Sequence, residues 1–478
     1  MYAIILLNNI KLGGLYIMLI KLLVDNFLSF ENESELSMVT SNKIQKMSDH
    51  KINIKGASVL KHAVIYGANA AGKSNLIEAF KFIKYCVRKT IPANATTMFC
   101  KTKESNSTRP STFEITFTCE DKVFAYGFSV ILQERKITAE WMYELHQNGS
   151  AKTLFERQNG EKPQLGDRLA LDKLDTSKMD TYLEDFDESS SMLFLSFMNK
   201  EKKYSSSTKL SFFQDIYNWI DESLDVFTPQ STITDFEYYY DEASLSQINK
   251  LIRTFDTGIT DITIESISQE EMKKEVPDKI FSDIIEKISK KIEDDSSEKV
   301  RISMRSNTSF FNVELLENGE VKVTTIKLKH GKSFYDFAFI EESEGTRRLF
   351  ELLDILFNKA ENKVYVIDEM ERSLHPKLTS RFIELFNQMH LEQKIQLIFT
   401  THEASIMDQD LFRRDEIWFV ERNKDNQSTI YSLDKFKERY DRVLSKSYLE
   451  GRYGAIPIFS SFDFKEEIYA RRNQINCK

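Results

Sequence analysis

The sequence predicts an α/β fold whose core is divided by a long insertion. Two observations support this prediction. In residues 335–422, apolar runs expected to form buried strands alternate with helical patterns, which is typical of a parallel sheet covered by helices. Residues 160–325 are instead polar, charged and mostly helical in pattern, and they separate this region from a similar strand–helix unit at residues 63–87.

Length and composition limit the alternatives. The 478 residues suggest two or three domains, and 41% apolar and 12% aromatic content suffices for a sizeable core. A net charge of −9 argues against a protein that coats polyanions in general, although it is compatible with a local basic patch. The four cysteines lack C-x-x-C or metal-ligand spacing and predict reduced thiols in a cytoplasmic protein: Cys86, Cys100, Cys119 and Cys477.

The first 17 residues are expected to lie outside the fold. They are apolar, but they are short for a membrane span and polar residues interrupt them. They also lack the basic start and the cleavage site of a signal peptide. Met18 begins the predicted first strand, and Leu12-Gly13-Gly14 allows a purine-rich ribosome-binding sequence just upstream. We therefore expect residues 1–17 to be a translated leader, and we expect no membrane segment.

A phosphate-binding loop follows the predicted strand Ala63–Tyr66. Gly67–Ser74 has the form G-x-x-x-x-G-K-S, and a helical pattern continues to about Val87. The glycines let backbone N–H groups face a phosphate chain, and the helix N-terminus adds its dipole. Lys73 is expected to reach the β- and γ-phosphates, and the Ser74 hydroxyl to ligate Mg²⁺. The alternative is a chance glycine-rich turn, which the complete motif in this context disfavours.

Residues 18–160 are expected to form one lobe around this loop. Three alternating runs rich in aromatics, FEITFTC, VFAYGFSVIL and ITAEWMYEL, predict an antiparallel sheet attached to the core. The residues expected to contact the nucleotide in this lobe are Gly67, Asn69, Ala70, Ala71, Gly72, Lys73, Ser74 and Asn75.

The insertion, residues 161–325, carries no recognisable motif. Lys279–Asp295 predicts an amphipathic helix. No heptad pattern is sustained over three repeats, so long coiled-coil arms are not expected. The second lobe then spans residues 326–478. Its predicted elements are a strand at 335–342, a helix at 347–358, a strand at 364–368, a helix at 376–389 and a strand at 395–400.

Two acids follow the apolar run that ends at Ile367. Asp368 is placed to hold Mg²⁺ directly or through water, and Glu369 to orient an attacking water and accept its proton. The alternative is a strand that happens to end in two acids. The phosphate loop upstream favours the catalytic interpretation.

Two further features are less specific. Ser343 and Gly345 precede a helix and are suited to present a hydroxyl and N–H groups to a phosphate, but Ser343 also satisfies the rule for an ordinary helix N-cap. His402 ends a buried strand at the sheet edge where ligands of α/β proteins bind. It predicts a contact to the γ-phosphate, with a structural histidine as the alternative.

In this order the motifs resemble those of an ABC-type ATPase head, as found in structural-maintenance and RecF-like proteins. GANAAGKS resembles the Walker A motif, SEG the signature, VYVIDE the Walker B motif, ERSLHP the D-loop region and TTHE the switch histidine. The chain is also similar to AAA-type ATPases of bacterial phage-defence islands, including RloA-like proteins, the AbiL ATPase component and the AriA subunit of PARIS systems. That similarity rests on IKLLVDNFLSF, YGANAAGKSNLIEA, EESEGTRRLFEL, IDEMERSLHP and KSYLEGRYGAIP, within residues 18–90 and about 335–460.

The resemblance implies an ABC-ATPase-like head that binds ATP and Mg²⁺ and hydrolyses ATP. It also implies an ATP-sandwiching homodimer or higher oligomer, in which Ser343 and Gly345 of one chain face Lys73 of the other. The signature reads ESEGT rather than the transporter form, and no Q-loop glutamine is evident. The segment after His402 is too short for a Toprim nuclease domain, so any nuclease chemistry is expected in a partner.

Three functions remain open at this point. The first is an ATPase that senses phage infection, with a phage protein as a trigger, and controls a separately encoded toxic effector such as a Toprim-type nuclease. The second is a DNA-repair ATPase. The absence of predicted coiled-coil arms and the net negative charge argue against it, whereas steeply salt-dependent DNA binding would support it. The third is a non-catalytic ATP-dependent scaffold, against which the complete acid pair counts. A transporter ATPase is least expected.

Overall fold

The computed structural model describes residues 18–457 with internal gaps, so the predicted leader at residues 1–17 lies outside the described residues. Within the described range the residues left out are 55–56, 120–121, 147, 159–160, 168, 190, 203, 205–207, 230–238, 240–241, 295–300, 306–308, 317–319, 358–361 and 438–441. No helix in the described part of the chain has the length and apolar character needed to cross a membrane.

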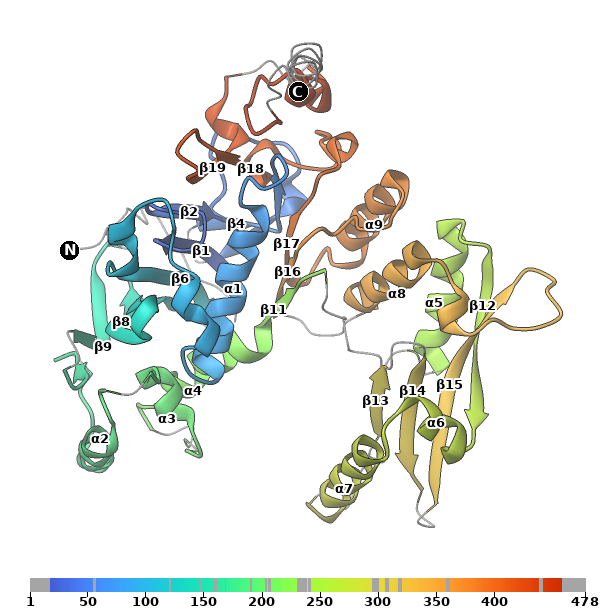
Figure 1. The fold of residues 1–478 in the computed structure, drawn as a ribbon, viewed down its shortest axis with the longest axis horizontal. Helices are drawn as coiled ribbons and strands as arrows, with labels where there is room; N and C mark the ends of the chain where they lie inside the picture. The colour runs from blue at the N-terminus through green and yellow to red at the C-terminus, as the bar shows by residue number, and fades with distance from the viewer. Residues whose placement is uncertain are drawn as a thin grey trace, which may run out of the picture.

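A six-stranded sheet forms the centre of the molecule (Figure 1). Its strands, in spatial order, are β11 (Leu224–Phe227), β16 (Asn362–Ile367), β17 (Lys394–Thr400), β5 (His62–Tyr66), β18 (Ile417–Arg422) and β19 (Ser428–Ser432). The first five are parallel, and β19 is antiparallel to β18. Because parallel strands end at the same edge of a sheet, the segments that follow β5, β16 and β17 are brought together there.

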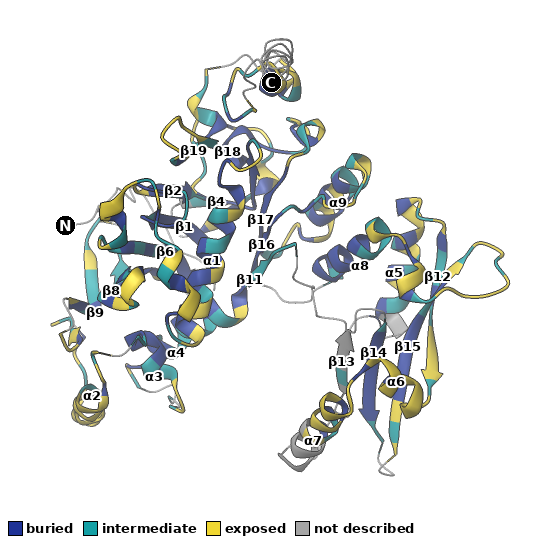
Figure 2. Cartoon of the chain, viewed as in Figure 1, coloured by how far each residue is buried: buried dark blue, intermediate teal, exposed yellow. Residues whose placement is uncertain are grey.

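Both faces of this sheet are buried (Figure 2). Alternate residues of β5 enter different hydrophobic clusters, with Ile65 in one and Val64 in the other. Helix α1 (Lys73–Arg88) covers the first face, and α8 (Glu344–Phe357) and α9 (Pro376–Met389) cover the second. Burial on both faces explains the continuous apolar runs in the sequence and confirms the predicted α/β class.

A seven-stranded antiparallel sheet packs against α1 and contacts the core sheet through β1, whose Leu19 exchanges two hydrogen bonds with Gln396 of β17. In spatial order its strands are β10 (Gln164–Leu165), β9 (Ala151–Gln158), β8 (Lys136–Leu145), β7 (Lys122–Ile131), β6 (Ser111–Cys119), β1 (Met18–Asp25) and β2 (Ser34–Ser37). The three aromatic-rich runs form β6, β7 and β8, as predicted. Aromatic contacts join the layers, since Phe82 of α1 lies 4.8 Å from Phe113 between ring centroids. A separate two-stranded sheet contains β3 (Lys51–Ile54) and β4 (Ala57–Leu60).

The first part of the insertion packs against this antiparallel sheet. Glu140 of β8 is fully buried and accepts hydrogen bonds from the backbone N–H groups of Phe194 (2.7 Å) and Leu195 (3.0 Å). These N–H groups open a helix and have no partner within it, so the carboxylate satisfies them. Arg157 pairs with the same carboxylate at 3.1 Å. The helices of this part are α2 (Lys173–Asp185), α3 (Phe194–Asn199) and α4 (Phe212–Asn218).

The second part of the insertion contains a four-stranded antiparallel sheet that the sequence did not predict. Its strands, in spatial order, are β12 (Ile259–Ile267), β15 (Val321–His330), β14 (Phe310–Leu315) and β13 (Arg301–Arg305). The predicted amphipathic helix is present as α7 (Asp278–Asp294), beside α6 (Gln269–Glu275). Figure 1 shows this sheet at the end of the molecule opposite α2. The predicted lobe boundary at residues 325 and 326 falls inside β15.

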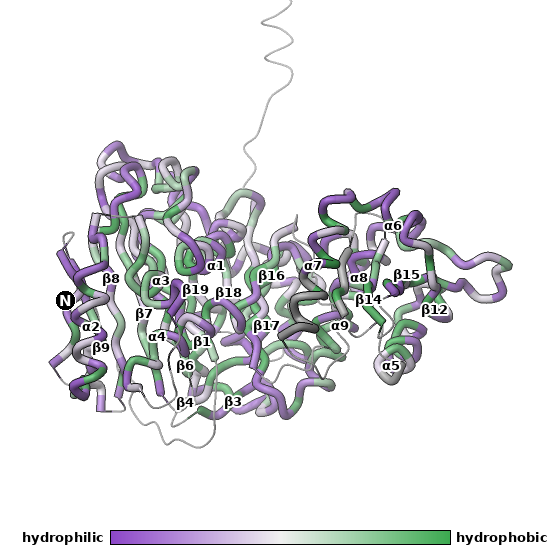
Figure 3. Tube along the Cα trace, turned by 90° about the horizontal axis from the view of Figure 1, so that it is seen from below, coloured by the Kyte–Doolittle hydropathy of each residue, from purple (hydrophilic) through white to green (hydrophobic). Residues whose placement is uncertain are grey.

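The two faces of this distal sheet, β12–β15, contact different neighbours. Phe311 and Val323 pack with α6 and α7, whereas Phe310 and Ile326 face α8 and α5 (Glu242–Ile252). Seen from below, hydrophobic residues run along α8 and the core strands, and hydrophilic residues outline the connecting loops (Figure 3). The distal sheet therefore shares a hydrophobic cluster with the second face of the core sheet.

The strand predicted at residues 335–342 is wrong. Phe337 makes a single bridge with Leu328, and Phe339–Glu341 forms a 3₁₀ turn. The predicted strand begins instead in an exposed turn, in which Tyr335 is 77% exposed. Glu342 contacts His330 Nε2 at 2.6 Å, two residues before α8 begins. The other elements predicted in this lobe are present as α8, β16, α9 and β17.

Candidate nucleotide-binding site

The phosphate loop runs from the end of β5 to the start of α1. A Cβ atom on Gly67 would lie 2.4 Å from the backbone oxygen of Val420 in β18. Gly72 has a φ of +112°, and a Cβ there would lie 2.4 Å from the Ser428 hydroxyl in β19. Only glycine fits either position without a shift of the neighbouring strands. The two motif glycines are thus explained by close approach and by backbone conformation.

Two serines that the sequence did not single out support the loop from outside. The Ser428 hydroxyl donates to the carbonyl oxygen of Ala71 and lies 2.7 Å from the Ser29 hydroxyl. The Asn75 side-chain amide donates to Ser29 at 2.7 Å. Ser29 and Ser428 belong to segments far apart in the sequence. No local motif marks them, so only the fold reveals their role.

Lys73 lies inside the loop and is 5% exposed. Its Nζ atom donates to the carbonyl oxygens of Gly67 (2.7 Å) and Ala68 (3.1 Å) and lies 3.3 Å from His402 Nδ1. Burial lowers the pKa of Lys73 to about 8, although nearby acids, Glu371 first among them, oppose this change. Partial burial and the neighbouring ammonium lower the pKa of His402 as well. Nδ1 of a neutral His402 therefore accepts the lysine's hydrogen bond.

The two predicted acids follow β16 and lie against the end of β17. The Thr400 hydroxyl donates to Asp368 Oδ1 at 2.6 Å and accepts the Glu369 N–H at 2.8 Å. Glu369 has a φ of +48°, a left-handed conformation that is unusual for a non-glycine residue. Backbone strain of this kind is concentrated at functional sites, where surrounding contacts maintain it.

A cavity of about 1220 Å³ opens over the loop, large enough for a nucleotide. The predicted residues that border it are Asn69, Ala70, Ala71, Gly72, Lys73, Ser74, Asn75, Glu369 and His402. The sequence did not predict several other bordering residues, including Phe99, Lys101, Glu371, Arg372 and Arg422. Three strand ends therefore place phosphate-binding, acidic and histidine side chains around one cavity.

Ser74 and Asp368 are suited to hold Mg²⁺. A hydroxyl and a carboxylate are hard oxygen ligands of the type that Mg²⁺ prefers. Ser74 borders the cavity, and Asp368 is buried one residue before Glu369, with Thr400 fixing one carboxylate oxygen. This donor set fits the metal that a phosphate loop requires.

Ser343 and Gly345 do not border the cavity of their own chain. The Ser343 hydroxyl accepts the Thr346 N–H at 3.1 Å, so it caps α8, as the alternative interpretation held. A Cβ on Gly345 would lie 2.4 Å from the backbone oxygen of Ser373, which does border the cavity. The signature segment is thus close to the cavity rim and exposed at Ser343.

A family model described as "AAA domain, putative AbiEii toxin, Type IV TA system" matches residues 63–408. This chain belongs to that AAA family. The match runs from β5 through the phosphate loop, the insertion and the acid pair to just beyond His402. It confirms the predicted AAA-type ATPase domain. The finer similarity to RloA-like, AbiL and AriA proteins stays a prediction.

Solved structures similar to this AAA domain include three SMC heads. The SMC head domain from Thermotoga maritima is 15% identical with a TM-score of 0.34, and the match covers 87% of this chain and 98% of that chain. An SMC head bound to the C-winged helix domain of ScpA is 14% identical with a TM-score of 0.35, and the match covers 87% of this chain and 98% of that chain. An SMC head with an extended coiled coil, bound to the C-terminal domain of ScpA derived from Pyrococcus furiosus, is 15% identical with a TM-score of 0.34, and the match covers 92% of this chain and 99% of that chain. These values are too low to carry a functional conclusion. No curated protein matches the sequence.

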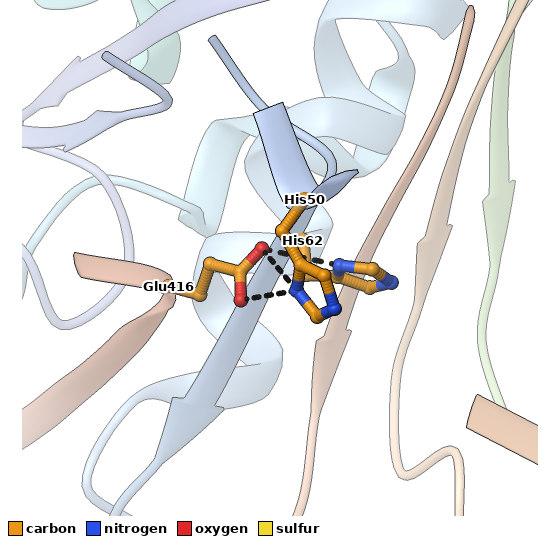
Figure 4. A group of neighbouring side chains, drawn as sticks. All are labelled: His50, His62 and Glu416. Carbon is orange, nitrogen blue, oxygen red and sulfur yellow. Dashed lines mark hydrogen bonds and ion pairs between the residues drawn. The ribbon is translucent and has the colours of Figure 1, made fainter. Parts of the chain in front are cut away.

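A second titratable cluster lies at the opposite end of β5 (Figure 4). Glu416 is fully buried and accepts hydrogen bonds from His50 Nδ1 (2.9 Å), His62 Nδ1 (3.2 Å) and the backbone N–H of Arg413 (2.7 Å). Two histidines and a carboxylate are ligands that transition metals accept. Here, however, three donors already satisfy the carboxylate, and a closed zinc site needs a fourth ligand that the described residues do not supply. The cluster therefore joins the residues that flank the β3–β4 pair to the residue before β18 as a hydrogen-bonded network.

This cluster makes stability depend on pH. Burial lowers the pKa of His62, so below about pH 6.5 the unfolded chain binds a proton that the folded chain does not. The pKa of Glu416 is lowered to about 2, since hydrogen bonds and charge from the two histidines outweigh its burial. Its stabilising contribution is present above about pH 4.5 and is lost as the pH falls toward 2. Both groups destabilise the fold on acidification.

We expect His62→Leu to reduce the pH dependence of stability between pH 7.5 and 5. The measurement is the free energy of unfolding by urea at several pH values. Titration of His62 contributes at most about 1.4 kcal/mol per pH unit to the slope of this free energy against pH. His146→Leu, in a turn between β8 and β9, is the matched control and should keep the wild-type slope. Equal slopes in wild type and His62→Leu would show that His62 does not titrate in this way.

Proposed function

We propose that this protein binds MgATP over Gly67–Ser74 and hydrolyses it. The observation that carries the proposal is the convergence of Lys73, Glu369 and His402 on one cavity from the ends of three parallel strands. A phosphate loop supplies backbone N–H groups and a cation, and a carboxylate beside it supplies a base. Membership of an AAA family supports nucleotide binding.

Each side chain has a distinct role in this proposal. Lys73 holds the β- and γ-phosphates, and Ser74 and Asp368 hold Mg²⁺, which neutralises phosphate charge when bound. Glu369 orients the attacking water and accepts its proton. His402 contacts the γ-phosphate through its ring.

The site is proposed to be completed by a second copy of the chain. Ser343 and Gly345 lie outside the cavity of their own chain, and Ser343 is exposed. A hydroxyl and a helix N-terminus suit a phosphate. In the proposed dimer they close over the nucleotide bound to the partner's phosphate loop.

Mixing two inactive variants tests this arrangement. Lys73→Ala removes the phosphate contact, and Ser343→Arg blocks the signature surface without the clash that a side chain at Gly345 would cause. We expect each variant alone to lack ATPase activity and a mixture to recover up to about a quarter of the wild-type rate, because half of the dimers are mixed and each holds one intact site. The measurement is phosphate release at fixed total protein.

The control is a mixture of Lys73→Ala with Lys73→Ala/Ser343→Arg, in which no intact site can form. Activity in that mixture would point to contamination. Failure of the first mixture to recover activity, with both variants folded, would contradict a site shared between chains.

We further propose that the ATP-dependent dimer controls a separately encoded toxic effector in antiphage defence. This proposal rests on the predicted similarity to defence ATPases and on the family description, which refers to a toxin–antitoxin system. Co-purification of the protein with the product of the neighbouring gene tests it. If the purified protein instead bound DNA with a steep salt dependence, a DNA-repair role would replace it. ATP-dependent assembly without hydrolysis would indicate a scaffold.

A further inference from the structure

Four hydrogen bonds join the loop that carries the acid pair, residues 368–372, to the loop that carries the histidine, residues 400–402. Three of them involve Thr400. They are Thr400 Oγ1 to Asp368 Oδ1 (2.6 Å), the Glu369 N–H to Thr400 Oγ1 (2.8 Å), the Met370 N–H to the Thr400 carbonyl (3.2 Å) and the His402 N–H to Glu371 Oε1 (2.5 Å). The two loops therefore form one hydrogen-bonded unit at the edge of the sheet.

The bond from the His402 N–H to Glu371 differs from the other three, because its acceptor, Glu371, borders the cavity. Glu371 lines the cavity wall with Glu369, and its burial raises the pKa of its carboxyl group. The second carboxylate oxygen, Oε2, is buried and makes no hydrogen bond of ordinary geometry among the described residues, although the Thr401 side chain is near enough to the carboxyl group to lower its pKa in part. A buried carboxylate with one unsatisfied oxygen is costly, and such groups call for an explanation at the site where they occur.

Glu371 also completes a chain of contacts from the phosphate loop. Lys73 Nζ lies 3.3 Å from His402 Nδ1, and the backbone of His402 bonds Glu371. Apart from this contact with Lys73, the His402 side chain makes no hydrogen bond among the described residues, and much of the residue is exposed. Its ring position therefore depends on its backbone, which Glu371 fixes from the acid loop.

We propose that Glu371 is a positioning residue that holds His402 against Lys73 and the γ-phosphate position. It accepts the His402 N–H and so fixes the histidine to the same loop that carries Glu369. Glu371 begins the ERSLHP segment that resembles a D-loop region, and the sequence alone gives it no individual role. The inference rests on the proposed ATP hydrolysis, in which His402 contacts the γ-phosphate.

The first test is a double-mutant cycle in the full-length protein. Glu371→Ala removes the acceptor and is expected to lower kcat about 10-fold with KM changed less than about twofold, since it displaces His402 but leaves Lys73, Ser74 and Asp368, the proposed ligands of the phosphates and Mg²⁺, in place. Glu371→Gln keeps an oxygen acceptor and should retain most of the activity. Glu371→Ala/His402→Ala should be no slower than His402→Ala. A multiplicative loss in the double variant, or wild-type kcat in Glu371→Ala, would overturn the proposal.

The second test does not depend on hydrolysis. The chain has seven histidines, and the His402 resonance of ¹³C-histidine-labelled protein is identified by its absence in His402→Ala. The groups that set its titration are Lys73, Glu369 and Asp368, together with burial of the ring. In Glu371→Ala the released ring should titrate at a higher pH, closer to an ordinary histidine, while the other six resonances stay unchanged.

Glu384→Ala is the control, because Glu384 is an exposed acid on α9 that pairs only with Arg381 at the surface in the described contacts. It should leave both kcat and the His402 titration unchanged. An unaltered His402 titration in Glu371→Ala would overturn the positioning role. A wild-type protein that binds but never hydrolyses ATP would instead overturn the proposed function, and the titration would still decide the role of Glu371.

Discussion

Glu369→Gln is expected to lower the rate of ATP hydrolysis about 1000-fold while ATP stays bound. The substitution keeps the size of the side chain and its place in the cavity but removes the group that accepts the proton of the attacking water. The residues proposed to hold the phosphates and Mg²⁺ are unchanged, so ATP is trapped. Single-turnover phosphate release and the ratio of bound ATP to ADP after gel filtration measure the effect.

The same variant should accumulate as an ATP-dependent dimer, because the closed state is no longer resolved by hydrolysis. Light scattering of the protein with and without MgATP follows this assembly. Glu384→Gln, a surface acid on α9, should behave as wild type in both measurements. Hydrolysis by Glu369→Gln at the native rate would remove Glu369 from the catalytic role.

Lys73→Ala is expected to weaken ATP binding about 100-fold. Lys73 is the cation at the centre of the loop, and charge-assisted hydrogen bonds to phosphate contribute about 1.5–3 kcal/mol each. Titration calorimetry with MgATP in the absence of turnover measures the loss.

Lys81→Ala is the matched control for this experiment. Lys81 lies on the same helix, but it is half-exposed and pairs with Glu78 rather than with the loop. The control separates loss of the phosphate contact from a general effect on α1. Binding by Lys73→Ala within twofold of wild type would show that the loop does not hold the phosphates through this lysine.

Local motifs predicted the centre of the site, because its chemistry lies in short segments. The phosphate loop, the acid pair and His402 each follow an apolar strand, and parallel strands end together, so their convergence was predictable from the sequence. Ser29, Ser428 and Glu371 were not assigned roles. Ser29 and Ser428 act through contacts between segments far apart in the sequence. Glu371 acts through a hydrogen bond to His402, which follows a different strand.

In the fold, too, some elements were predictable from the sequence and others were not. The long apolar runs β5, β16 and β17 are buried on both faces and were recognisable. In the distal sheet the helices α6 and α7 separate β12 from the other three strands, and the alternation of all four strands is hidden in a polar region. At residues 335–342 the error had the opposite cause, since Tyr335, Phe337 and Phe339 alternate with Asp336 and Ala338, but Tyr335 and Phe337 are exposed rather than part of a buried strand.

The position of β11 has a consequence for how the insertion relates to the rest of the molecule. Phe227, at the end of β11, accepts the backbone N–H of Asp368 at 2.9 Å, and β11 covers the outer edge of β16. Excising residues 161–325 as a module would leave that edge unpaired and would strip apolar cover from α8. Exposed strand edges promote aggregation. The insertion is therefore an integral part of the ATPase core, and a truncation that tests its role must retain β11.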